Sequence, residues 1–139
     1  MAVARFLVDT SAWARLHQPL VAARVVPLVE RGLVATCSPL DLEILFSTRS
    51  PDEYEQVLAE RAGLEPVDLD QEQWDRALEV QRALAASARL RAVGIPDLIV
   101  AATAERHGLA VLHYDADFDV VAQITGQDCR WVVPRGTVS

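Results

Sequence analysis

Four carboxylate side chains stand in apolar stretches of the sequence, and they are the residues that point to chemistry. Asp9 and Asp115 each directly follow a strand-like apolar run, Glu43 lies inside the apolar segment Leu40–Phe46, and Asp97 begins an apolar helix-like stretch. An unpaired carboxylate costs several kcal/mol to desolvate, and clustered carboxylates repel one another and raise each other's pKa. Hard divalent cations such as Mg²⁺ or Mn²⁺ relieve both costs, so the pattern predicts a metal site.

Each acid has an ordinary structural explanation when it is taken alone. The alternatives are that Asp9 caps the turn Thr10-Ser11-Ala12, that Asp97 is a helix-start acid, that Glu43 pairs with Arg49, and that Asp115, Asp117 and Asp119 form a solvated turn. The occurrence of all of them in one short chain favours a common site.

The elements that must position these acids follow from hydrophobic periodicity. Strands are predicted at residues 4–8, 33–36, 110–113 and 129–133, and helices at residues 12–16, 20–31, 39–47, 51–61, 71–86 and 97–107. The alternating order predicts an α/β fold with a mostly parallel sheet flanked by helices on both sides. Asp9 and Asp115 then follow two strands at the edge where open α/β sheets bind ligands, so we expect them to converge on one crevice.

Helix boundaries carry local signals. Ser38 with Pro39 and Asp41, and Asp70 with Gln73, are typical of helix starts. Left-handed glycines are expected to end helices at Gly32, Gly63 and Gly108. Pro27 predicts a kink or two shorter helices.

Composition bounds the class of protein. A chain of 139 residues with 51% hydrophobic residues predicts a single folded domain spanning residues 1–139, with no internal repeat or linker. A net charge of −7 argues against a generally basic nucleic-acid binder, so any RNA contact must be local. The sequence has neither a secretory signal nor an apolar run long enough to span a membrane, which predicts a cytoplasmic location. Cys37 and Cys129 are expected to be reduced structural thiols.

The sequence resembles the PIN-domain ribonucleases, specifically the VapC-type toxins of VapBC toxin–antitoxin systems. The resemblance covers essentially the whole chain and rests on residues 7–11 (LVDTS), the acid Glu43, residues 95–102 (IPDLIVAA) and residues 112–118 (LHYDADF). It implies a PIN-like α/β/α sandwich in which Asp9, Glu43, Asp97 and Asp115 form a catalytic acidic quartet. Asp117 is a further ligand or a supporting acid, and Ser11 matches a position often found beside the site.

The resemblance also implies what the site does. We expect Mg²⁺- or Mn²⁺-dependent cleavage of RNA that leaves a 5′-phosphate and a 3′-hydroxyl, with one or two ions, the first held mainly by Asp9, Asp97 and Asp115 and the second nearer Glu43 and Asp117. A cognate VapB-like antitoxin, a homodimer and a heterotetramer or larger complex with the antitoxin are expected, and no membrane partner. One departure is His113, where many relatives carry Ser or Thr; its ring nitrogen orients a ligand, or it is merely a histidine at a strand end.

Residues for substrate binding are less marked. Ser11 and the arginines Arg15, Arg89 and Arg91, with Arg82, are the candidates for a rim that binds RNA phosphates, although solvated surface arginines are the alternative. Trp13 and Trp74 are expected to be core residues in preference to base-stacking platforms.

Two other functions compete with the nuclease. A haloacid-dehalogenase phosphatase also begins with an aspartate after its first strand, but it needs a second aspartate two residues later, where this chain has Ser11. A non-catalytic metal- or partner-binding α/β module uses the same acids without turnover. Replacing Asp9 by Asn distinguishes these, since it should abolish cleavage and leave partner binding largely intact.

Overall fold

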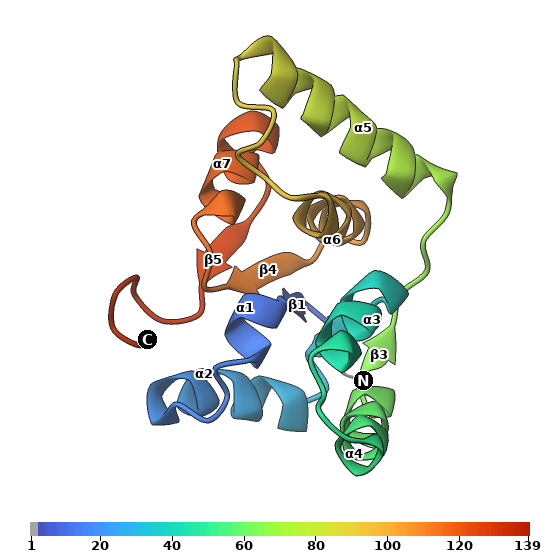
Figure 1. The fold of residues 1–139 in the computed structure, drawn as a ribbon, viewed down its shortest axis with the longest axis vertical. Helices are drawn as coiled ribbons and strands as arrows, with labels where there is room; N and C mark the ends of the chain where they lie inside the picture. Colours follow the sequence, from blue (N-terminus) through green and yellow to red (C-terminus); the bar gives the residue numbers. More distant parts are fainter. Residues whose placement is uncertain (1–2) are drawn as a thin grey trace.

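In a computed structural model that describes residues 3–139, a parallel five-stranded sheet lies at the centre of the molecule (Figure 1). Its strands are β1 (Phe6–Val8), β2 (Val34–Thr36), β3 (Glu65–Pro66), β4 (Ala110–His113) and β5 (Cys129–Trp131). Their order across the sheet is β3-β2-β1-β4-β5, and all four pairings are parallel. After β1 the chain adds β2 and β3 on one side, and later it adds β4 and β5 on the other side. The junction between β1 and β4 is therefore the topological switch point, where such sheets bind ligands.

Helices cover both faces of this sheet. α1 (Thr10–Trp13) and α2 (Pro19–Glu30) pack on one face. The other face is covered by α3 (Ser38–Phe46), α6 (Ile95–Arg106) and α7 (Asp117–Thr125), with α5 (Gln71–Ala86) packed on the outer side of α6 and α4 (Pro51–Ala62) beside α3 (Figure 1). The prediction of an α/β/α sandwich with a mostly parallel sheet is confirmed.

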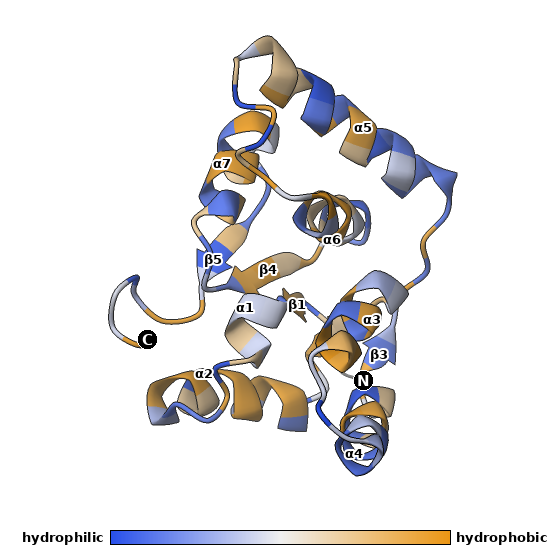
Figure 2. Cartoon of the chain, viewed as in Figure 1, coloured by the Kyte–Doolittle hydropathy of each residue, from blue (hydrophilic) through white to orange (hydrophobic). Residues whose placement is uncertain are grey.

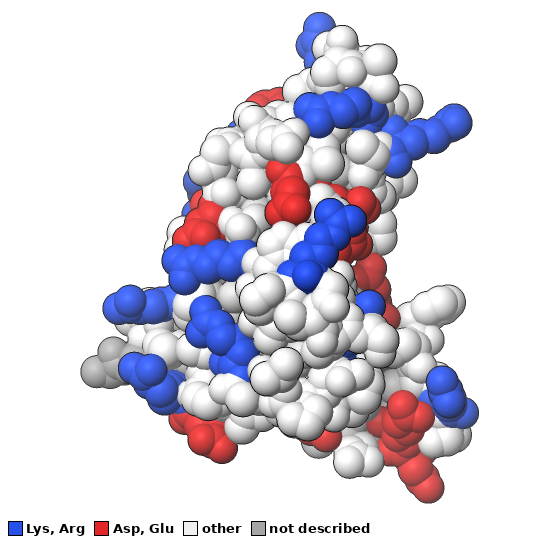
Figure 3. Space-filling model, turned by 90° about the vertical axis from the view of Figure 1, so that its left-hand side faces the viewer, with Lys and Arg blue, Asp and Glu red and all other residues white. Residues whose placement is uncertain are grey.

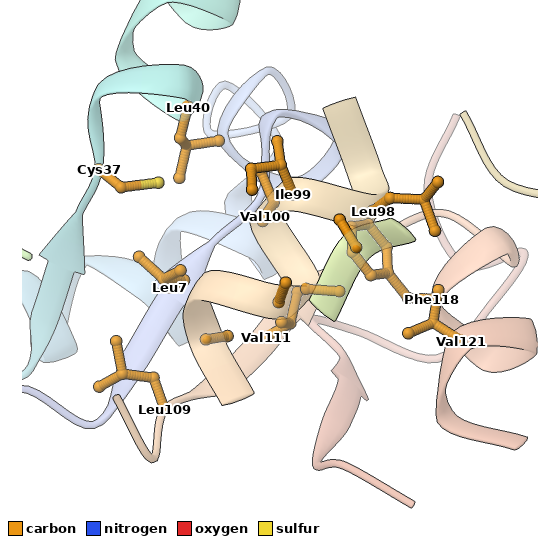
Figure 4. Packing of buried hydrophobic residues seen from close by; sticks show 14 of the residues in the cluster. Leu7, Cys37, Leu40, Leu98, Ile99, Val100, Leu109, Val111, Phe118 and Val121 are labelled. Carbon is orange, nitrogen blue, oxygen red and sulfur yellow. The ribbon is translucent and has the colours of Figure 1, made fainter. Parts of the chain in front are cut away.

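Alternation along the strands produces two apolar layers. Leu7 and Val111 pack with α6 and α7, as Figure 4 shows, whereas Phe6, Val8 and Leu112 face α1 and α2. β1 and β4 are buried on both faces, so β1 and residues 110–112 of β4 are hydrophobic and appear orange in Figure 2, while α4 at the periphery is mostly blue. Burial of this kind supplies the main favourable term in folding and fixes the strand ends that carry the acids.

Some boundary predictions hold and others are wrong. Asp70 and Gln73 form a complete capping box at the start of α5, and Gly32 and Gly108 have the left-handed φ values of 70° and 66°. Gly63 instead has φ −78°, so the helix before it ends without a left-handed residue. Pro27 does not divide its helix, because α2 runs unbroken from Pro19 to Glu30 with the proline close to its C-terminal end.

Further differences concern the elements near the acids. The residue before α3 is Cys37 and not Ser38, and Asp41 bonds to other elements and not to its own helix start. β3 and α7 were not predicted. α7 begins at Asp117, so the Asp-rich stretch that suggested a solvated turn is in fact the beginning of a helix that packs Phe118 and Val121 into the core.

Within residues 3–139, no helix is both long and apolar enough to cross a membrane. The thiols of Cys37, which is buried, and Cys129, which is half-buried, are free, as the sequence predicts. Burial raises the pKa of Cys129 to about 12, which keeps this thiol protonated.

Candidate metal centre

Asp9 occupies the end of β1 and has two different carboxylate oxygens. Oδ2 accepts hydrogen bonds from the backbone N–H of Ser11 (3.0 Å) and from the Ser11 hydroxyl (2.7 Å), which caps α1. Oδ1 is buried and has no hydrogen-bond partner, in a residue that is 2% exposed. A buried anionic oxygen without a partner is costly, so capping explains only half of this side chain.

Asp97, Asp115 and Asp117 form a tight trio. Each offers one carboxylate oxygen, and these oxygens all lie within 4.8 Å of one another. Asp97 lies in the first turn of α6, while Asp115 follows β4 and its Oδ1 accepts the backbone N–H of Asp117 (2.9 Å) at the start of α7. Three carboxylates at such distances resemble the ligand set of a hard divalent cation.

The trio, Asp9 and Glu43 form one electrostatic unit, which we call the acid cluster. The pKa of Asp97 rises to about 8, first because the residue is desolvated and then because Asp9, Asp115, Glu43 and Asp117 repel its charged form. Burial, followed by Glu43, raises the pKa of Asp9 despite its bonds to Ser11. Like charges gathered out of water either take up a proton or bind a cation, and carboxyls perturbed in this way at the ends of strands are candidates for a functional site.

Glu43 reaches this cluster from α3, a helix separate from those that carry the aspartates. The side chain is half-buried, and among the ion pairs of residues 3–139 there is none between Glu43 and Arg49. The alternative in which Arg49 neutralises Glu43 is therefore wrong.

The buried side chain of His113, at the end of β4, contacts the backbone of Asp115. Its buried ring lies 5.1 Å from the ring centroids of both Phe118 and Trp131, and Nδ1 accepts the backbone N–H of Asp115 (3.2 Å). Burial lowers the pKa of His113, so the neutral ring carries its proton on Nε2, which has no partner. The ring therefore orients the backbone of Asp115, and its nitrogen does not bond to the carboxylate.

Of the predicted substrate-binding residues, Ser11 and Arg15 lie beside the cluster. The Ser11 hydroxyl also accepts the backbone N–H of Tyr114 (2.9 Å), so it joins the end of β1 to the end of β4. Arg15 donates to the carbonyl oxygen of Ser11 (2.6 Å) and lies over the ring of Tyr114. Sequence reasoning missed Tyr114, although its place between the strand end and Asp115 was a usable signal.

The remaining candidates lie elsewhere. Arg82 is exposed on α5, and Arg89 and Arg91 are exposed in the segment after it, where Arg89 donates to Gln123 of α7 (3.1 Å). Trp13 packs against both apolar layers, as expected, whereas Trp74 is 44% exposed and the expectation of a core position for it is wrong.

Comparison with known protein families identifies the family to which the chain belongs. A family model described as PIN domain matches residues 6–124. The chain therefore belongs to the PIN-domain family.

Relatives within that family narrow the assignment to the VapC ribonucleases. The chain is 44% identical to Ribonuclease VapC51 and 47% identical to Ribonuclease VapC21 of Mycobacterium tuberculosis, in each case over 134 residues that cover 96% of this chain and 97% of the relative. Among solved structures, its fold is similar to that of a chain of DNA-bound VapBC from Salmonella typhimurium, with a TM-score of 0.75, 19% identity and coverage of 94% and 100% of the two chains. A chain of VapBC-5 from Mycobacterium tuberculosis gives a TM-score of 0.66 at 25% identity, with coverage of 93% and 99%.

Proposed function

We propose that this chain is a metal-dependent endoribonuclease, the toxin of a type II toxin–antitoxin pair, acting in the cytoplasm as one PIN domain that spans residues 1–139. The observation that carries the proposal is the buried, unpartnered Oδ1 of Asp9, in a carboxylate that acts together with four further acids from other elements. The naming of the VapC relatives as ribonucleases supports the same reaction.

The acid cluster suits Mg²⁺ or Mn²⁺. Its potential ligands are all carboxylate oxygens, which these hard ions prefer, and the trio already brings three of them within 4.8 Å of one another. Asp97, Asp115, Asp117 and Asp9 would hold an ion, and Glu43 would join them if a second ion binds. A bound divalent ion supplies positive charge that activates water for attack and offsets the charge of the phosphodiester.

The protein's own residues prepare this site before any ion or RNA arrives. Ser11 fixes one oxygen of Asp9 through two hydrogen bonds and leaves the other unpartnered. The backbone N–H of Asp117, at the start of α7, donates to the carboxylate of Asp115, and Nδ1 of His113 accepts the backbone N–H of Asp115. Carboxylates fixed in this way need little reorganisation, which is the protein's contribution to such a site.

The reaction is tested by incubating purified protein with a mixed pool of structured cellular RNAs and Mg²⁺ or Mn²⁺. We expect discrete products that disappear with EDTA and in the Asp9→Asn variant. A matched control is Asp75→Asn, which makes the same change of charge on the exposed face of α5. A folded, metal-loaded and antitoxin-free protein that cleaves no RNA would instead favour the non-catalytic binding module.

The antitoxin partner and the homodimer belong to the same proposal. Large apolar side chains are exposed on neighbouring helices, including Phe46, which is 92% exposed, with Leu42, Leu78 and Ile95. Exposed apolar groups gathered in this way are typical of protein interfaces, and one solved structure with a similar fold is a toxin–antitoxin complex from Klebsiella pneumoniae. Light scattering at micromolar concentration should give the mass of a dimer, and a monomer would remove the dimer from the proposal.

A further inference from the structure

On the side of the molecule that carries α2, β5 and the residues after β5, four arginines lie over aromatic rings. We call these four residues the arginine row. From guanidinium carbon to ring centroid, the pairs are Arg15 over Tyr114 at 4.7 Å, Arg135 over Trp131 at 5.6 Å, and Arg130 and Arg24 over Phe6 at 5.6 and 5.9 Å.

The strands set the order of the row. Tyr114 immediately precedes Asp115, so Arg15 lies next to the acid cluster. Phe6 begins β1, three residues before Asp9, which is about 10 Å along a strand. Arg130 of β5 lies in register with Leu112, on the face of the sheet that Phe6 shares. The row therefore leads from the acid cluster toward the opposite end of the sheet.

Two of the four charges of the row have no acidic partner. Arg130 pairs with Asp128 (2.7 Å), and Arg15 donates to the carbonyl oxygen of Ser11 and to a main-chain oxygen of the final residue, Ser139. Arg24 and Arg135 form no ion pair among the residues that the structure describes. Figure 3 shows several basic side chains gathered on this side, in a chain whose net charge is −7. The row is thus a local positive region on an acidic protein.

Stacking also prepares these arginines for phosphate. A guanidinium that lies over an aromatic ring leaves its planar N–H edge directed away from the ring, where phosphate oxygens can accept paired hydrogen bonds. In Arg24 and Arg135 this edge has no partner among the residues that the structure describes, whereas in Arg130 it is held by Asp128 (2.9 and 2.7 Å) and a phosphate would have to share it. The acid cluster repels a polyanion, so affinity for RNA must come from residues outside it.

We propose that the arginine row binds the phosphates of a single-stranded RNA segment that flanks the cleavage site. This inference rests on the proposed ribonuclease function and adds the path of the substrate: from the acid cluster past Arg15, then along Arg135, Arg130 and Arg24. The row acts on affinity and on KM, and it does not touch the phosphodiester that is cleaved.

The test combines Arg24→Gln with Arg130→Gln, both exposed and outside the acid cluster. Binding of a fluorescent single-stranded RNA of about 20 nucleotides is measured by anisotropy in the Asp9→Asn background, where no cleavage interferes. We expect affinity at low salt to fall about tenfold or more, and the slope of log K against log salt to become shallower by roughly 1.4, because two phosphate contacts are lost. Arg24→Lys with Arg130→Lys should keep most of that slope.

A matched control removes two arginines elsewhere, Arg49→Gln with Arg106→Gln, which changes the net charge equally. Equal losses in both double variants would overturn the proposal, since they would report net charge alone. RNA affinity that is unchanged in the row variant while antitoxin binding is lost would also overturn it and make the row a protein contact.

Cleavage kinetics separate this inference from the function on which it rests. With RNA cleavage active, the row variant should raise KM about tenfold for a long RNA and leave a short RNA that covers only the cleavage site unaffected. If the protein cleaves no RNA but the row still governs RNA binding, the proposed function fails and the row stands. Normal cleavage of long RNA by the row variant, with unchanged KM, overturns the row alone.

Discussion

Helix α3 carries two acids, Asp41 and Glu43, and their electrostatic surroundings are opposite. Asp41 forms an ion pair with Arg61 (2.7 Å), and Thr36 bonds to both of them; we call these three residues the Arg61 network. Glu43 instead joins the acid cluster, where like charges raise the pKa values of Asp97 and Asp9. Residues two apart on a helix do not face one another, so one helix serves both regions.

The two regions show how this protein treats charges that are out of water. Arg61 is 2% exposed; its Nε donates to Asp41, its Nη2 donates to Thr36, and the ring of Trp13 lies 4.6 Å from its guanidinium carbon, while Nη1 has no hydrogen-bond partner. The acid cluster gathers five carboxylates with no cation of the protein among them. In the first arrangement each buried charge has a partner, so removing one partner is costly, while in the second the carboxylates repel one another and cost stability.

The sharpest way to break this comparison is to neutralise one acid of the cluster. We expect Asp97→Asn to lower RNA cleavage by about 100-fold or more, because the loss of a ligating group exceeds the cost of losing an outer partner. The same variant should unfold at a higher temperature than the parent in EDTA at pH 8, because the amide of the variant carries no charge that burial and the neighbouring acids destabilise. Calorimetry measures the unfolding temperature, and a cleavage assay on the same sample measures the activity. A fall in both the unfolding temperature and the cleavage rate would contradict the contrast between the acid cluster and the Arg61 network.

In the Arg61 network, a substitution is expected to lower the stability of the folded state. Arg61→Met leaves Asp41 without its partner, so the free energy of unfolding should fall by about 2–4 kcal/mol, a little under the cost of breaking a fully buried pair because Asp41 is partly exposed. Urea unfolding measures the change. Adding Asp41→Asn should recover part of the loss by removing the uncompensated charge; strict additivity of the two changes would show that they are not coupled.

Ser11 lies at the border between structure and chemistry. Ser11→Ala removes the hydroxyl that donates to Asp9 and accepts from Tyr114, and we expect cleavage to fall 10- to 100-fold, roughly the range for partners of ligating groups. Ser11→Thr keeps the hydroxyl and is the matched control. If both variants lose cleavage equally, the hydroxyl is not what orients Asp9.

The pH dependence of the metal-free protein follows from Asp97. Its folded pKa of about 8 lies above the ordinary value of 3.8, so between these pH values the folded state holds a proton that the unfolded state has released. This group's contribution therefore lowers stability as pH rises through that window. We expect the unfolding temperature in EDTA to rise as pH falls from 8 toward 5, and saturating Mg²⁺ to flatten the trend. A flat profile in EDTA would contradict the desolvated cluster.

The smallest expected effect calibrates the others. Asp70→Ala removes the capping box of α5, which belongs to neither charged region, and should cost about 1 kcal/mol of stability. Cleavage per folded molecule should not change. A loss of cleavage here would show that the assay reports stability, and the Asp97 and Ser11 results would have to be reinterpreted.

The sequence predicted the architecture because apolar runs and their alternation are local properties. The same logic brought Asp9 and Asp115 together, since both follow strands of a parallel sheet. It failed for α7, where closely spaced aspartates masked the apolar face formed by Phe118 and Val121. It also failed for Arg61, because the partner of a buried charge 20 residues away in the chain leaves no local pattern.

The arginine row shows the same limit. From the sequence, Arg89 and Arg91 were proposed for the rim, whereas Arg24, Arg130 and Arg135 come from segments that only the folded sheet brings to one side. Stacking on Phe6 and Trp131 is a tertiary fact. Sequence patterns therefore indicate the acids of such a site more readily than the residues that guide the substrate.

The bond between Ser11 and Tyr114 spans 103 residues, and it closes the junction at which Asp9 and Asp115 meet. Contacts this distant in the chain form only after the intervening segments have been made and ordered. During translation, a growing chain that has not yet passed Asp117 lacks one of the five acids and the helix that fixes Asp115. A fragment whose synthesis stops before Asp117 therefore lacks part of the acid cluster.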